Sequence, residues 1–142
     1  MIYTDATKKA LKLCFDAHKD QLDKSGIPYV FHPFHLAEQM TTEETIIVAL
    51  LHDVVEDSDI TFEDLAKDFD KPIIDAIKLL THKDKSVKYE DYVRKIKENP
   101  IAKAVKLADL MHNSDITRLD VVTQKDLERR KKYLDAIKLL NE

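Results

Sequence analysis

The sequence predicts an all-α fold in a single domain, and three observations support this. The chain has 142 residues but only one glycine, Gly26, whereas the hairpins and bulges of β-rich folds usually need several. Apolar residues recur at spacings of three and four, as on one face of a helix. Hydrophobic residues make up 44% of the chain, enough for one core. We therefore expect residues 1–142 to form one helical bundle of about seven to eight helices.

The N-terminal third is predicted to hold two helices joined by a loop. The apolar stripe of the first helix consists of Ala6, Ala10, Leu13, Cys14 and Ala17. Residues 24–28 (Lys-Ser-Gly-Ile-Pro) interrupt the helical pattern and predict a loop. We expect a short second helix after Pro33, running to about Met40.

The next helix is predicted to be the central one. Thr41 and Glu44 have the spacing of a capping box, with Thr41 as the N-cap and Glu44 as the third helical residue. The helix that follows, Thr45–Val55, is apolar on almost every side. Because a helix without a polar face is usually enclosed by others, we expect it to lie in the middle of the domain.

Five further helices complete the predicted bundle. Their expected first residues, or caps, are Thr61, Pro72, Tyr89, Pro100 and Thr123. We expect the helices that begin at Pro72, Tyr89 and Pro100 to end near Leu80, Lys97 and Met111, respectively. The apolar positions of the last helix are Leu127, Leu134, Ile137 and Leu140.

Composition excludes several classes of protein. A single glycine rules out dinucleotide-binding and Walker-type glycine loops, and a single cysteine, Cys14, rules out intramolecular disulfides and multi-cysteine zinc sites. The net charge of −4 disfavours binding to a nucleic acid polymer. No apolar run reaches the roughly 18 residues of a membrane span, and the N-terminus lacks the apolar stretch of a signal peptide. We therefore expect a cytoplasmic protein without a membrane partner, and make no prediction of its oligomeric state.

Ionisable residues are concentrated at the end of the predicted central helix. Residues 52–57 read His-Asp-Val-Val-Glu-Asp. Carboxylates near a helix C-terminus meet the negative end of the helix dipole, and they also repel one another. A solvated helix end or ordinary salt bridges would explain such a cluster, but a bound cation explains it better, because burial of unpaired charges is costly.

Two isolated polar residues in apolar surroundings complete a candidate metal site. His32 lies within an apolar stretch, where a histidine is usually a core residue, and Asp109 lies on a helix, where an aspartate usually pairs with a lysine such as Lys106. Together with His52 and Asp53 they make a set of two imidazoles and two carboxylates, which suits manganese, iron, zinc, cobalt or nickel. Glu56 follows His52 by four residues, and Asp57 follows Asp53 by four, which places these carboxylates about one helical turn (roughly 6 Å) away.

Three segments carry a resemblance to a known family. They are residues 24–33 (KSGIPYVFHP), 49–57 (ALLHDVVED) and 105–113 (VKLADLMHN). With these motifs the chain resembles the HD-domain metal-dependent phosphohydrolases, and most closely the hydrolase domain of the RelA/SpoT alarmone enzymes and their small single-domain relatives. The similarity extends from about Ala17 to Asn113.

The resemblance implies a fold, a cofactor and a reaction. The fold would be all-α, and one divalent ion, usually Mn2+, would be held by His32, His52, Asp53 and Asp109. Glu56 and Asp57 would position or deprotonate the attacking water and handle the leaving group; we expect Glu56 to be the base, although the two roles could be exchanged. The reaction would remove pyrophosphate from the 3′ position of guanosine tetra- or pentaphosphate, a small-molecule nucleotide.

The resemblance also suggests residues for substrate binding. Asn113 would contact the ribose or a phosphate, and Lys24 would face the phosphates. Further cationic candidates are His18, Lys106 and Arg118. The chain departs from the family immediately before Lys24, because Asp23 stands where the alarmone hydrolases have an arginine that packs on the guanine base.

Two alternative functions remain open at this point. Other HD-domain enzymes are nucleoside monophosphate phosphatases, which release orthophosphate instead of pyrophosphate. The chain could also be a non-catalytic nucleotide-binding domain that keeps the metal. The Glu56 and Asp57 pair favours hydrolysis, because a metal scaffold alone would not need these carboxylates.

Overall fold

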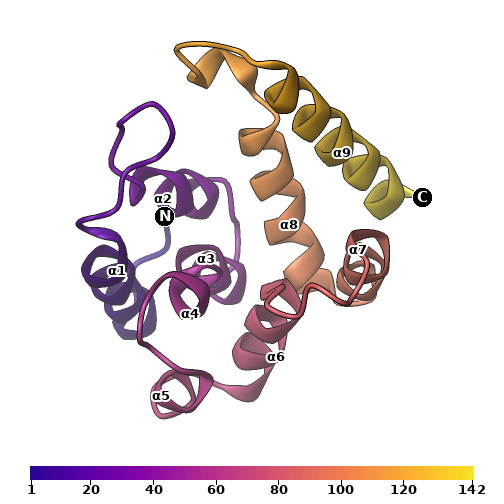
Figure 1. Cartoon of the computed structure of the whole chain (residues 1–142). Coiled ribbons are helices and arrows are strands. Elements are labelled where there is room, and N and C mark those ends of the chain that lie inside the picture. Colours follow the sequence, from indigo (N-terminus) through magenta and orange to yellow (C-terminus); the bar gives the residue numbers. More distant parts are fainter.

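All the regular secondary structure of the chain is helical, as the sequence predicts. The computed structural model describes all 142 residues, and Figure 1 shows the arrangement of their helices. The elements are α1 (Asp5–His18), α2 (Phe31–Glu38), α3 (Glu43–Leu51), α4 (Val54–Asp57), α5 (Phe62–Ala66), α6 (Lys71–Leu80), α7 (Tyr89–Lys97), α8 (Pro100–Asn113), the 3-10 helix η1 (Ile116–Arg118) and α9 (Gln124–Asn141). The only strand-like pairing is one isolated bridge between Leu22 and Pro28. The all-α class is therefore confirmed.

Helix α3 is the centre of the bundle. Residues 46–51 are all fully buried, and α3 contacts α1, α2, α6 and α8. Figure 1 shows α3 enclosed by these neighbours. Full burial of six consecutive side chains explains why the segment has no polar face, because every side of the helix meets another helix.

The side-chain caps set the helix starts. Thr61 and Thr123 cap α5 and α9 as expected, each in a capping box with the aspartate three residues later. The cap of α3 differs by one residue from the prediction: it is Thr42, whose hydroxyl accepts a hydrogen bond from the Thr45 amide at 3.2 Å. The Thr45 hydroxyl also donates to the Thr42 carbonyl, so a pair of threonines replaces the predicted Thr41 and Glu44 box.

The predicted helix Thr45–Val55 is interrupted at His52 and Asp53. Helix α3 ends at Leu51, and Asp53, with φ −108° and ψ −1°, is the N-cap of the one-turn helix α4. This break adds a ninth α-helix to the eight expected segments. The break also changes the direction of the backbone between His52 and Asp53, two of the four predicted metal ligands.

Helix α9 covers the edge of the bundle. It packs against α7 and α8. Of its predicted apolar positions, Leu140 is buried, whereas Leu127 and Leu134 are exposed. None of the nine helices combines the length and the apolar character that crossing a bilayer would require.

Candidate metal centre and active site

Four side chains that are far apart in the sequence meet at one point between α2, α3 and α8. One donor atom each from His32, His52 and Asp109 lies within 4.8 Å of the others. Asp109 Oδ1 is 2.9 Å from His32 Nε2 and 3.7 Å from His52 Nε2. Asp53 Oδ2 lies 3.0 Å from the same nitrogen of His52. The structure thus brings together all four residues that the sequence suggested as metal ligands.

The helix break allows two adjacent residues to face one point. The Nδ1 atom of His52 lies 2.6 Å from the Ala49 carbonyl, to which it donates, and this bond turns Nε2 toward the site. Asp53 follows after the change in backbone direction, and the Tyr29 hydroxyl donates a hydrogen bond to its Oδ2 atom. On a continuous helix these neighbours would have pointed about 100° apart.

His32 is oriented by His112, a residue that the sequence analysis does not single out. The Nδ1 atoms of His32 and His112 are 2.7 Å apart, and their rings are stacked with centroids 5.0 Å apart. His112 is therefore not one of the converging donors but holds a donor in place. Tyr29 likewise orients Asp53, through the hydrogen bond from its hydroxyl, and the sequence analysis does not identify it. Their spacing in the sequence could have identified both residues, because Tyr29 precedes His32 by three residues and His112 follows Asp109 by three.

Asp109 receives hydrogen bonds from residues on its own helix. Lys106 donates to Oδ2 at 3.0 Å, and Asn113 donates to Oδ1 at 2.9 Å. Both lie on the face of α8 that carries Asp109, one turn before and one turn after it. The Lys106 ammonium also lies 5.3 Å from the ring centroid of Tyr92. Two residues expected to bind substrate therefore support a metal ligand in this structure.

The buried charges of the site are balanced against one another. Burial opposes ionisation of Asp109, but the Lys106 ammonium and the neighbouring imidazoles of His32 and His52 together outweigh it and hold the pKa of this carboxyl well below its usual range. Burial likewise opposes ionisation of Asp53, but His52 and the hydrogen bond from Tyr29 together outweigh it and lower the pKa to about 2. Burial opposes the charged form of His52, yet the Asp53 carboxylate raises its pKa. Two ionised carboxylates thus lie in a largely buried site, which favours a cation.

The donor set fits a divalent metal ion. His52 Nε2 is buried and has no hydrogen-bond partner, although two carboxylate oxygens lie beside it. Such an orphaned buried nitrogen costs free energy unless something binds to it. Two imidazole nitrogens and two carboxylate oxygens suit manganese, iron, cobalt, nickel or zinc. His32, His52, Asp53 and Asp109 are the residues that would hold the ion.

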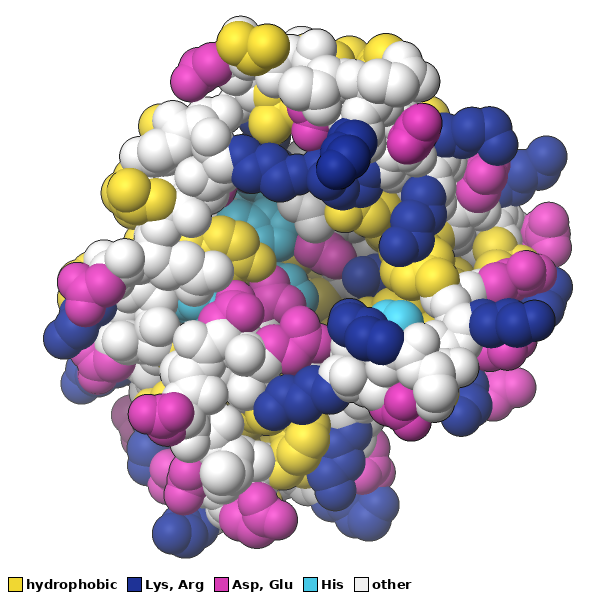
Figure 2. All heavy atoms as spheres, in the orientation of Figure 1, with side chains coloured by type: hydrophobic (Ala, Val, Ile, Leu, Met, Phe, Trp, Pro, Cys, Tyr) yellow, Lys and Arg dark blue, Asp and Glu magenta, His cyan; other side chains and the backbone are white.

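Two hollows open beside this centre. The first, called here the Glu56 hollow, has a volume of about 270 Å³, and its lining includes His52, Asp53, Glu56, Lys85, Lys106, Asp109 and Lys132. The second, called the Lys24 hollow, has a volume of about 290 Å³, and its lining includes Asp23, Lys24, His32, Arg118, Asp126 and Arg129. Asn113 and Tyr133 line both. Figure 2 shows a central depression with histidine and acidic side chains inside it and lysine and arginine side chains around its rim.

Glu56 and Asp57 face different parts of the molecule. Glu56 lines the hollow named after it, and its Oε1 atom accepts a hydrogen bond from the His82 amide at 2.8 Å. Asp57 is turned toward the end of α1, where its Oδ2 atom accepts a bond from Gln21 Nε2 at 3.3 Å and lies 4.0 Å from His18 Nδ1. Only Glu56 therefore shares a hollow with the metal ligands.

The remaining predicted substrate residues fall into two groups. Lys24 and Arg118 line the Lys24 hollow, as a substrate contact requires. His18 is fully buried, and its ring packs against Tyr29 with centroids 5.0 Å apart. The expected substrate contact of His18 is therefore corrected: it lies behind Tyr29, because the end of α1 turns its side chain into the protein.

Comparison with known proteins agrees with this geometry. The sequence profile described as "HD domain" matches residues 10–113. The guanosine-3′,5′-bis(diphosphate) 3′-pyrophosphohydrolase of Aquifex aeolicus is 33% identical over 78% of this chain. The bifunctional (p)ppGpp synthase/hydrolase SpoT of Escherichia coli K12 is 36% identical over 59% of this chain. The aligned regions are 18% and 12% of these two relatives, so the chain spans less than a fifth of their length.

A solved structure extends the similarity over almost the whole chain. It is that of a metazoan ortholog of SpoT described as hydrolysing ppGpp, and it superposes with a TM-score of 0.77 at 27% sequence identity. The match covers 99% of this chain and 88% of the other. The family profile matches from α1 to the end of α8, and four side chains converge within the matched region, so the chain belongs to the HD domain family.

Proposed function

We propose that residues 1–142 act as one HD-type phosphohydrolase domain that removes pyrophosphate from the 3′ position of guanosine tetra- or pentaphosphate. The observation that carries the proposal is the convergence of His32, His52, Asp53 and Asp109 beside a hollow with an ionisable wall residue, Glu56. The names of the relatives support the choice of substrate. The proposed setting is the cytoplasm, with a diffusible nucleotide as the binding partner.

The reaction exchanges one phosphorus–oxygen bond for another. The oxygen of a water molecule bonds to the proximal phosphorus of the 3′-diphosphate, and the bond from that phosphorus to the ribose 3′ oxygen breaks. One proton leaves the water, and the ribose oxygen takes up a proton to become a hydroxyl group. Guanosine tetraphosphate thus gives pyrophosphate and guanosine 5′-diphosphate.

The side chains of the site have separate tasks in this proposal. A bound divalent ion, for which we propose Mn2+, supplies Lewis acidity that lowers the pKa of a water molecule and neutralises phosphoryl charge. Glu56 accepts the proton from the attacking water, because it is the carboxylate that lines the hollow without being a metal ligand. Asp57 holds α4 against the end of α1 through its contacts with Gln21 and His18. Lys24, Asn113 and Arg118 contact the nucleotide from the Lys24 hollow.

A nucleotide panel tests the proposal. The Mn2+-loaded protein is incubated with guanosine tetraphosphate, guanosine pentaphosphate and nucleoside monophosphates, and the products are separated by ion exchange. We expect pyrophosphate and guanosine 5′-diphosphate from the tetraphosphate. Release of orthophosphate from the monophosphates alone would instead identify a nucleoside monophosphate phosphatase. No product from any nucleotide, with metal bound, would identify a non-catalytic nucleotide-binding domain and contradict the proposal.

A further inference from the structure

The two hollows beside the metal centre differ in their free positive charge. In the Lys24 hollow each cation has a carboxylate partner. Arg118 Nη2 is 3.7 Å from Asp23, while Lys24 and Arg129 lie 3.8 and 3.1 Å from Asp126. Asp23, Asp126 and a third carboxylate of the same lining, Asp115, balance these three cations and repel a phosphate group. The Lys24 hollow therefore offers little uncompensated positive charge to a polyphosphate.

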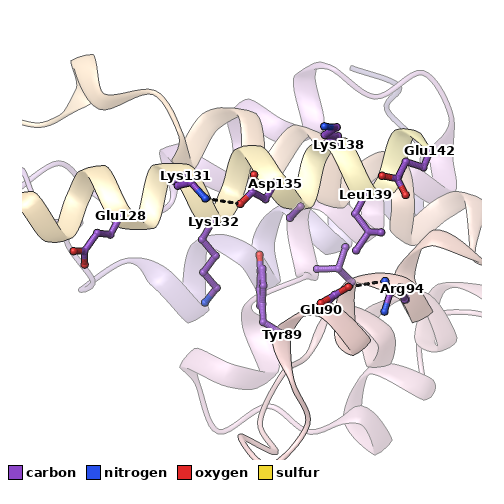
Figure 3. A pocket seen from close by; sticks show the side chains of 12 residues that line it. Tyr89, Glu90, Arg94, Glu128, Lys131, Lys132, Asp135, Lys138, Leu139 and Glu142 are labelled. Atoms are coloured by element: carbon purple, nitrogen blue, oxygen red, sulfur yellow. Dashed lines mark hydrogen bonds and ion pairs between the residues drawn. The ribbon is translucent and has the colours of Figure 1, made fainter.

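The Glu56 hollow holds two lysines without a carboxylate partner. Lys85 Nζ donates to the His82 carbonyl at 2.7 Å, and Lys132 Nζ lies 4.0 Å from the ring centroid of Tyr89. Neither forms an ion pair, whereas Lys131, the neighbour of Lys132, pairs with Asp135 at 3.4 Å. Figure 3 shows Lys132 extending from α9 beside Tyr89, and Lys131 held beside Asp135. The ring face of Tyr89 favours a cation at this position without neutralising it.

We propose that Lys85 and Lys132 form the subsite for the pyrophosphate that the reaction releases, with the nucleoside on the other side of the metal centre. This inference rests on the proposed function. In a displacement at phosphorus the attacking water lies opposite the leaving ribose oxygen. Because Glu56 places that water in the Glu56 hollow, the ribose lies toward the Lys24 hollow. The distal phosphate then reaches the two free ammonium groups, which donate charge-assisted hydrogen bonds to its oxygens.

The subsite predicts a preference for pyrophosphoryl over phosphoryl groups. A single phosphate at the metal centre is already beside the ligands of the ion and does not extend to the rim of the hollow. A second phosphate lengthens the group and brings further negative charge to Lys85 and Lys132. The two lysines therefore determine specificity without being part of the metal centre.

Matched lysine variants test the subsite. Lys85→Met and Lys132→Met each remove one free ammonium group and keep most of the apolar side chain. Lys131→Met is the control, because it lies on the same helix but its side chain pairs with Asp135 outside the Glu56 hollow. Binding of inorganic pyrophosphate and of orthophosphate to the Mn2+-loaded protein is measured by calorimetry at a fixed free Mn2+ concentration. Circular dichroism confirms that each variant is folded.

We expect each subsite variant to bind pyrophosphate about tenfold more weakly, which is the usual effect of one lost hydrogen bond to a charged group. Orthophosphate binding and the Lys131→Met control should remain at the wild-type values. An unchanged affinity for pyrophosphate would overturn the inference. An equal loss for both anions would also overturn it, because it would show a general effect of charge.

Parallel measurements of hydrolysis separate this inference from the proposed function. If the wild-type protein cleaves guanosine tetraphosphate but the lysine variants bind pyrophosphate normally, the subsite is wrong and the function stands. If the variants lose pyrophosphate affinity but the wild-type protein cleaves no alarmone, the subsite stands and the proposed substrate is wrong.

Discussion

Lys106 is the residue whose replacement tests the charge balance of the metal centre. Its ammonium group is 3.0 Å from Asp109 Oδ2, and the two side chains are only 12% and 10% exposed. Replacement of Lys106 by methionine keeps the packing of the aliphatic chain but leaves the Asp109 carboxylate without its cationic partner. The variant should therefore have a lower free energy of unfolding, mainly because the Asp109 carboxylate remains buried without a compensating charge.

The size of this loss depends on whether a metal ion is bound. Removal of one partner from a buried ion pair costs about 3–5 kcal/mol. Asp109 keeps the hydrogen bond from Asn113 at 2.9 Å, so we expect the lower limit, about 3 kcal/mol, in the metal-free protein. A bound divalent ion would compensate the carboxylate and reduce the loss to that of one charge-assisted hydrogen bond, about 1.5 kcal/mol.

Urea unfolding with chelator and with saturating Mn2+ measures both values. Lys103→Met is the matched control, because Lys103 lies on the same helix three residues earlier and forms no ion pair; it should change the unfolding free energy by less than about 0.5 kcal/mol. A Lys106→Met variant as stable as this control would refute the charge-balance argument. A loss that is the same with and without metal would show that the ion does not contact Asp109.

Two further predictions concern the residues around the ion. Glu56→Gln should keep metal and fold but lower kcat for guanosine tetraphosphate about a hundredfold or more, as expected for a lost proton acceptor; unchanged turnover would remove Glu56 from the mechanism. Tyr29→Phe should weaken Mn2+ binding about tenfold, because the hydroxyl that orients Asp53 is lost, and competition with a chelator measures this. Wild-type affinity in that variant would show that the hydrogen bond does not position Asp53.

The sequence was sufficient to predict the helices and the four side chains that converge in the structure. Apolar patterns, threonine caps and prolines together located all eight predicted segments. The four converging residues were recognisable because charged or imidazole side chains at apolar positions, such as Asp109, require a compensating partner. The helix break at His52 and Asp53 was not predicted, because the residues around it favour a continuous helix. The metal centre depends on this break.

The directions of exposed or capping side chains could not be predicted from the sequence. Glu56 and Asp57 are neighbours in the sequence, but only the fold determines that one faces the hollow and the other faces α1. His18 was a reasonable candidate for phosphate binding until the structure showed it fully buried. The pairing of Lys131 and the absence of an ion pair for Lys132 likewise depend on the packing of α9 against α7.

Metal content is the most direct test of the central claim that one divalent ion joins α2, α3 and α8. The wild-type protein, Asp53→Ala and Asp109→Ala are loaded with Mn2+, dialysed and measured by elemental analysis, with circular dichroism to confirm the helical fold. We predict about one equivalent of manganese in the wild-type protein and almost none in either folded variant. Full occupancy in both variants would contradict the proposed ligand set.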